Sequence, residues 1–169
     1  MLKRLLLCIT LVFIIFGAQA QNKKAAKYNN KIIDIQHSVT PKVVKFFKTF
    51  DKGNLEDLKA QQKDLIASFD KSISKVSSMK EFEGDAALRD AALEWFKFYK
   101  SSFEKEYNHI LELVANRDRS KEDHEKLDKL TDDLVVEEEK VDEKFAKVQE
   151  AFAKRHNLEL KEYPIEEAK

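Results

Sequence analysis

Two carboxylate–histidine pairs are the residues of this sequence whose types and spacing could bind a metal. Asp34 stands three residues before His37, and Glu106 stands three residues before His109. Residues three apart lie on one side of a helix, and helical bundles hold dinuclear centres through Glu-x-x-His pairs on two helices and a Glu on each of the others. Glu138 is the candidate for a further carboxylate.

The helical phase of these residues argues against a metal centre. At about 100° per residue, Asp34 lies opposite the apolar stripe of its helix, and His37 lies about 140° from the centre of that stripe. Glu106 and Glu138 fall within their stripes, but His109 is about 95° off. The two inward carboxylates would be about 12 Å apart along the bundle axis, too far for a dinuclear centre. We therefore predict no metal and no cofactor.

Several polar residues occupy positions of the stripes where apolar residues are expected: Gln36, Gln62, Glu106, Glu138 and Gln149. A buried polar group must find a hydrogen-bond partner or it costs a few kcal/mol. By level along the bundle, we predict that Glu138 accepts hydrogen bonds from Gln36, Trp95 or Tyr99. Such a polar layer either fixes the helix register or binds a small ligand or ion. A third interpretation is that the helices pack loosely around Glu138 and leave it exposed to solvent.

The elements that position these residues are four amphipathic helices. Apolar residues recur every three or four positions over residues 25–50, 55–78, 85–116 and 121–156. Gly53 and Gly84 fall where the pattern stops, and the loops between the helices are short. The sequence therefore predicts an all-α fold, an antiparallel up-down-up-down four-helix bundle over residues 21–158, without strands.

Local signals mark the ends of these helices. Pro41 lies inside the first helix, but the apolar stripe keeps its phase across it, which favours a kink over a new helix. Asn54 is typical of an N-cap, and Ser120 with Asp123 resembles a capping box. Asn157 fits a C-terminal cap. Residues 159–169 read as a charged tail, for which Tyr163 and Ile165 are the apolar contacts.

The first twenty residues have the pattern of a secretory signal peptide. Lys3 and Arg4 precede an apolar run over residues 5–16, and a small-x-small sequence ends at Ala20. We predict cleavage between Ala20 and Gln21. The run of about 12 residues is shorter than the ~20 of a spanning helix, so we expect no transmembrane anchor after cleavage. Leu7 before Cys8 does not match a lipobox. The predicted location is the periplasm or the cell surface.

Composition excludes further classes of function. The single Cys is lost with the leader, which removes thiol catalysis and Cys-ligated metals. The remaining chain has 29 Lys and Arg against 31 Asp and Glu, a net charge of −2 that gives no reason to expect a nucleic-acid partner. No Gly-x-Ser-x-Gly, phosphate loop or His-Glu-x-x-His is present. We therefore predict a binding protein and not an enzyme.

Aromatic residues are concentrated in the helix over residues 85–116, namely Trp95, Phe96, Phe98, Tyr99, Phe103 and Tyr107. Phe98 lies off the stripe, and Leu93 and Leu111 lie together on its other side. Either this helix is enclosed on most sides, or it leaves an apolar strip for another envelope protein or for a homodimer.

Four stretches resemble a family of exported bacterial proteins that are labelled surface proteins after a leptospiral member. They are Tyr28-Asn29-x-Lys31-Ile32-x-Asp34-Ile35-Gln36, Phe82-x-Gly84-Asp85-x-x-Leu88-Arg89-Asp90-Ala91-Ala92, Phe96-Lys97-Phe98-Tyr99-Lys100 and the segment from Phe145 to Lys154. The resemblance covers nearly the whole mature chain and implies an exported helical protein. That family has no assigned activity, so no catalytic or ligand residues carry over.

Overall fold

The described residues form helices that are arranged as four rods. The computed structural model describes residues 13–16, 20–50, 54–116 and 118–162. The first rod is α1 (Ala20–His37) followed by α2 (Thr40–Phe50), and the second is α3 (Leu55–Ser77). The third is α4 (Ala87–Glu104) followed by α5 (Glu106–Ala115), and the fourth is α6 (Lys121–Arg155). The prediction of an all-α bundle is confirmed.

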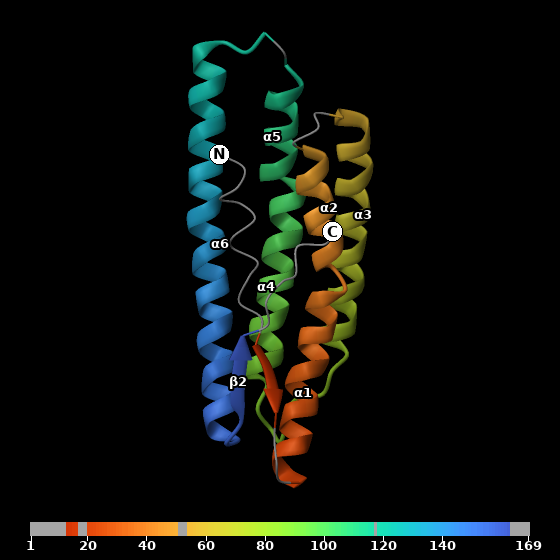
Figure 1. The fold of residues 1–169 in the computed structure, drawn as a ribbon, viewed down its shortest axis with the longest axis vertical. Helices are drawn as coiled ribbons and strands as arrows, with labels where there is room; N and C mark the ends of the chain where they lie inside the picture. Colours follow the sequence, from red (N-terminus) through yellow and green to blue (C-terminus); the bar gives the residue numbers. More distant parts are fainter. Residues whose placement is uncertain (1–12, 17–19, 51–53, 117, 163–169) are drawn as a thin grey trace.

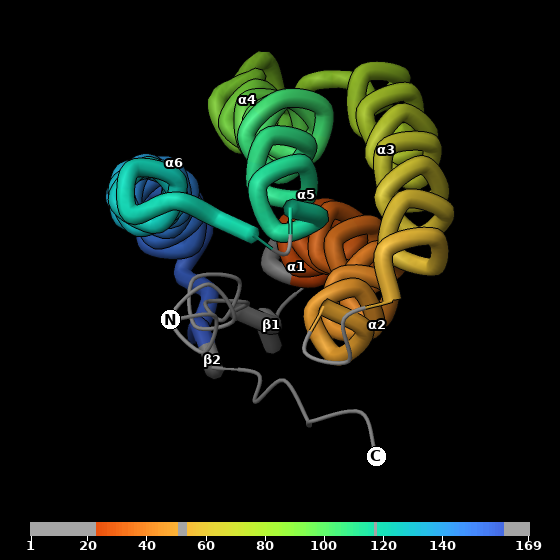
Figure 2. The backbone as a smooth tube through the Cα atoms, turned by 90° about the horizontal axis from the view of Figure 1, so that it is seen from above, coloured from red at the N-terminus to blue at the C-terminus, as the bar shows by residue number. Residues whose placement is uncertain are grey.

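The rod of α4 and α5 is the central one. The chain rises through α1 and α2, descends through α3, rises through α4 and α5, and descends through α6 (Figure 1). Seen from above, α4 and α5 lie between α3 and α6, with α1 and α2 below them (Figure 2). α6 packs on α4 and α5, whereas α3 packs on α2 and α4. None of the described helices has both the length and the apolar character needed to cross a membrane.

The first rod is broken where the sequence predicted only a kink. α1 ends at His37, Ser38 and Val39 form a turn, and α2 starts at Thr40. Pro41 has no N–H to donate to the carbonyl of His37, four residues earlier, so the helical ladder cannot run through this point. Val39 and Val43 are nevertheless both buried, so the apolar side continues across the break.

The third rod is also broken, at Lys105, and the sequence did not predict this break. The Lys105 N–H bonds to the carbonyl of Ser101, and α5 starts at the next residue. The carbonyl of Phe103, two residues before the break, accepts a hydrogen bond of 2.6 Å from Gln62 Nε2 of α3. The buried Gln62 therefore links α3 to the backbone of α4 next to the break.

The break also changes which residues α5 buries. Leu111, predicted to lie off the stripe, is only 1 % exposed, while Leu113 and Val114 are half-buried. Glu106, predicted to lie within the stripe, is the half-buried first residue of α5. Extrapolating one helical phase from α4 into α5 was wrong because the phase shifts at Lys105.

Replacing Gln62 by Leu tests this role. The substitution removes the Gln62 donor from the buried Phe103 carbonyl, and we expect the free energy of unfolding to fall by about 1–3 kcal/mol in urea titrations. The matched control is Gln61→Leu, because Gln61 is half-buried and donates to the Thr49 hydroxyl, at 2.9 Å, rather than to a backbone carbonyl. The control should lose less than about 1 kcal/mol. Equal losses for the two variants would contradict a special role for Gln62.

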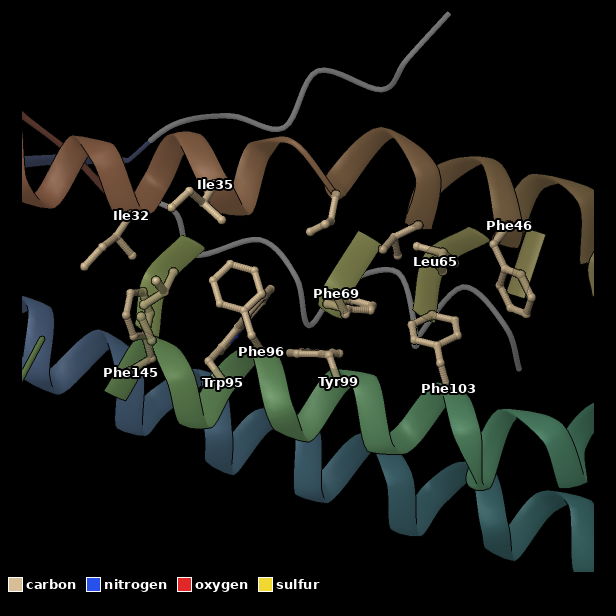
Figure 3. Packing of buried hydrophobic residues seen from close by; sticks show 14 of the residues in the cluster. Ile32, Ile35, Phe46, Leu65, Phe69, Trp95, Phe96, Tyr99, Phe103 and Phe145 are labelled. Carbon is tan, nitrogen blue, oxygen red and sulfur yellow. The ribbon is translucent and has the colours of Figure 1, made fainter. Parts of the chain in front are cut away.

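Aromatic rings fill the space between the second and third rods. Phe69 of α3 lies among the rings of Phe96, Tyr99 and Phe103, with ring centroids 5.8–6.5 Å away (Figure 3). Phe98 and Leu93 are half-buried and pack against this core, so α4 is more enclosed than its sequence required. In the described part of the chain, the only large apolar side chain classed as exposed is Val136 of α6, at 47 %.

The predicted caps are present. The Asn54 side chain accepts from the Asp57 N–H, and Ser120 forms a reciprocal capping box with Asp123. Asn157 adopts a left-handed backbone with φ of 50°, and the N–H of Leu158 bonds back to the carbonyl of Ala153 at 2.9 Å. Leu158 also packs against Ala153, which closes the end of α6.

A short two-stranded sheet joins the two ends of the chain, although the sequence predicted no strands. β1 (Phe13–Phe16) pairs antiparallel with β2 (Glu159–Glu162). The prediction that residues 159–162 belong to a tail is therefore wrong, because pairing between distant segments leaves no local signature. Tyr163 and Ile165 lie outside the described residues. The predicted cleavage point after Ala20 falls in the first turn of α1.

Candidate functional site

Two acidic residues of α6, Glu138 and Asp142, point toward the central rod. They are four residues apart, so their side chains lie one above the other on the same side of the helix. Glu138 is 1 % exposed, whereas its neighbours Glu137 and Glu139 are exposed. The prediction that Glu138 occupies an apolar slot is confirmed.

The aromatic donors of α4 and α5 are divided between the two carboxyls. Trp95 Nε1 donates to Asp142 Oδ1 at 2.7 Å, and the Tyr99 hydroxyl donates to the same oxygen at 3.1 Å. The Tyr107 hydroxyl donates to Glu138 Oε1 at 3.1 Å. The prediction that Trp95 or Tyr99 donates to Glu138 is therefore wrong. Both residues lie level with Asp142, which is one helical turn away from Glu138 on α6.

Asp142 is the residue that sequence reasoning missed. It is only half-buried and lies at the edge of the α6 stripe, so its phase alone gave no reason to select it. A signal was nevertheless present. A buried Trp needs an acceptor for its indole N–H, and the carboxyl one turn from Glu138 is the nearest acceptor that α6 offers to Trp95.

Burial makes both carboxyls weak acids. The pKa of Glu138 is raised to about 8, chiefly by the loss of hydration; the Tyr107 hydrogen bond opposes this rise, and the neighbouring Asp142 adds to it. Burial likewise raises the pKa of Asp142 to about 7, opposed by the hydrogen bonds from Trp95 and Tyr99. Burial and the two carboxylates also raise the pKa of Tyr99 well above its usual value. The pair therefore exchanges protons close to neutral pH.

Each carboxyl keeps one buried oxygen without a hydrogen-bond donor. These atoms are Glu138 Oε2 and Asp142 Oδ2, and Gln36 Oε1 of α1 is in the same state. Gln36 is 3 % exposed, as predicted, but it forms no hydrogen bond with Glu138 in the described part of the structure. Buried acceptors without donors are rare in folded proteins, and each has an energetic cost that another gain must offset.

The other predicted polar residues lie outside this group. Gln149 of α6 is fully buried and donates to Asn29 Oδ1 of α1 at 2.7 Å, a partner that the sequence did not suggest. Glu106 takes no part in the hydrogen bonds of Glu138 and Asp142. The polar contact between α6 and α1 is thus separate from the polar contacts between α6 and the central rod.

The two carboxylate–histidine pairs are not brought together in the fold. Asp34 and His109 are exposed, and His37 is half-buried rather than turned fully to water. Within the described residues, no three His, Cys, Asp or Glu side chains are placed to share a metal ion.

Replacing Tyr107 by Phe should weaken the bundle chiefly when Glu138 is ionised. The hydroxyl bonds more strongly to a carboxylate than to a carboxylic acid, so we expect a loss of about 1–3 kcal/mol near pH 9 and a smaller loss near pH 6. Urea unfolding at the two pH values measures both losses of stability. Tyr28→Phe is the matched control, because the Tyr28 hydroxyl is buried without a donor or acceptor. A control that loses as much as Tyr107→Phe would exclude the hydrogen bond as the cause.

Comparison of the chain with models of protein families, with curated proteins and with solved structures finds no match.

Proposed function

We propose that this chain is an exported helical-bundle protein of the periplasm or cell surface that acts by binding rather than by catalysis. The charged, apolar and small-residue pattern of residues 1–20 supports export. The resemblance to exported bacterial surface proteins points the same way.

The observation that carries the binding proposal is the carboxyl pair, in which Glu138 is buried and Asp142 is half-buried. A Leu at position 138 would complete the apolar stripe of α6 between Leu134 and Val141. A carboxyl in that slot costs desolvation energy, and replacing buried ionic groups by apolar ones is often neutral or stabilising. The pair therefore needs a gain other than packing, and a binding role supplies one.

Two kinds of ligand fit the bundle. The first is a protein, either another envelope protein or a second copy, in contact with the central rod where Leu93 and Phe98 are half-buried. The second is a small ligand or an ion held by interior polar groups around Glu138 and Gln36. The unpartnered oxygens of these two residues favour the second.

Native mass spectrometry of the protein purified from its own host separates these possibilities. Additional mass that survives desalting supports an interior ligand, whereas a dimer or a complex with a captured envelope protein supports a protein partner. A bare monomer, together with no crosslinked partner in cells, would overturn the binding proposal. N-terminal sequencing of the same sample tests export, for which we expect Gln21 as the first residue. A mature chain that begins at Met1 would overturn export.

A further inference from the structure

The hydrogen bonds between the helices indicate that Gln36, whose side-chain oxygen is unpartnered, lies on the side of α1 that faces α6. The hydrogen bond between Asn29 and Gln149 fixes the register of α1 against α6. Seven residues are nearly two helical turns and return to the same side of a helix, with a drift of about 20°. Because the two helices run in opposite directions in Figure 1, seven steps from this contact bring Gln36 level with Asp142. Glu138 lies one turn further along α6.

The chemistry of this group defines its ligand. The three unpartnered atoms, Gln36 Oε1, Glu138 Oε2 and Asp142 Oδ2, can all accept hydrogen bonds or coordinate a cation. The donors that reach the pair, Trp95 and the hydroxyls of two Tyr, already bond to the other carboxylate oxygens. What is missing is positive charge or N–H groups.

The nearby lysines of α6 do not supply that charge. Lys144 pairs with Glu94 and Lys140 pairs with Glu137, and all four side chains are exposed. Two carboxylates and one amide oxygen are few ligands for Ca²⁺, which takes six to eight oxygens, and Mg²⁺ demands near-octahedral geometry. A compact cation of single charge matches the group better.

We propose that Gln36, Glu138 and Asp142 form a binding site for one small monovalent cation, either an alkali-metal ion or the ammonium group of a small amine. This proposal rests on the interior-ligand form of the proposed function. The cation takes the place of protons on the two carboxyls, so its binding strengthens as the pH rises. It leaves the aromatic hydrogen bonds to Oε1 and Oδ1 in place.

Thermal unfolding of the full chain in different salts tests the site. At about pH 9 and one ionic strength, the reference salt is tetramethylammonium chloride, whose cation is too bulky and has no N–H to donate. We expect NaCl, KCl, ammonium chloride or methylammonium chloride to raise the Tm by about 5 °C, with a smaller rise near pH 6. A response to alkali salts alone identifies a metal ion, and a response to ammonium and methylammonium alone identifies an amine.

Matched variants assign the response to these residues. The double variant Glu138→Gln with Asp142→Asn should lose it, and Gln36→Leu should weaken it without a change of charge. Glu137→Gln with Glu139→Gln removes the same charge from exposed neighbours and should keep it. Equal Tm values in all salts, or an undiminished response of the inner double variant, would overturn the cation site. The protein-partner form of the proposed function would be unaffected by that result.

Discussion

Raising the pH from about 5 to about 9 is expected to lower the free energy of unfolding by about 4 kcal/mol or more. Burial raises the pKa of Asp142 from 3.8 to about 7 and that of Glu138 from 4.5 to about 8. Each pKa difference of one is worth about 1.4 kcal/mol, so ionising one of these carboxyls inside the bundle costs about 4 kcal/mol. Urea titrations across the pH range measure the loss.

The direction of this change follows from the number of protons that the folded and unfolded chains bind. Between about pH 4 and pH 8 the folded chain keeps protons on Asp142 and Glu138 that the unfolded chain releases. Stability therefore falls as the pH rises through this window, and the fall is complete once the pH exceeds the folded-state pKa of Glu138. Salt-bridged carboxylates with lowered pKa values would give the opposite slope. The titrations should use tetramethylammonium as the only added cation, so that proton release is measured alone.

The double variant Glu138→Gln with Asp142→Asn is the control for this prediction. It keeps the shape of both side chains and removes both protons from the titration, so the slope over this range should largely disappear. The exposed pair Glu137→Gln with Glu139→Gln should retain the slope of the natural chain. A slope that survives in the inner variant would mean that other groups titrate, and the buried pair would then be ionised at no cost to folding.

The four rods could be predicted from the sequence because each has a long apolar stripe bounded by caps. Ile32, Ile35 and Val43 recur at helical spacing and are buried as expected, and Asn54 and Ser120 cap where predicted. The breaks were harder to predict. Pro41 was visible, but whether a helix bends or restarts depends on backbone bonds that no residue type specifies. The break at Lys105 has no Pro or Gly that would indicate it, and the hydrogen bond beside it comes from Gln62 of another helix.

The candidate site was predicted in part for a related reason. Periodicity places a single helix, so it identified Glu138 and Gln36 as buried residues. The partners of Glu138 depend on the height of α6 against α4 and α5. The height assumed from the loop positions brought Trp95 and Tyr99 to Glu138, whereas the packed helices bring Tyr107 to it. Asp142 lies at the edge of its stripe, and only the packed bundle shows that an indole and a phenol point at it.

Replacing Phe103 by Ala is expected to be among the most damaging single changes in the core. Its ring is 1 % exposed and lies 4.4 Å from Tyr107, 5.3 Å from Phe46 and 5.8 Å from Phe69, measured between ring centroids. Removing it leaves a cavity where three rods meet, next to the break at Lys105. We expect a loss of about 3–5 kcal/mol and a fall in Tm of roughly 10 °C.

The matched control is Phe98→Ala, five residues earlier on the same helix. Phe98 is half-buried and can be partly replaced by water, so its loss should be less than half as large. The Phe103 variant should keep the m-value of the natural chain, because its backbone carbonyl still accepts from Gln62. Similar losses for the two variants would place the energetic centre of the bundle away from the junction of α4 and α5. A lowered m-value would show that the ring of Phe103, and not only Gln62, keeps the two helices aligned as one rod.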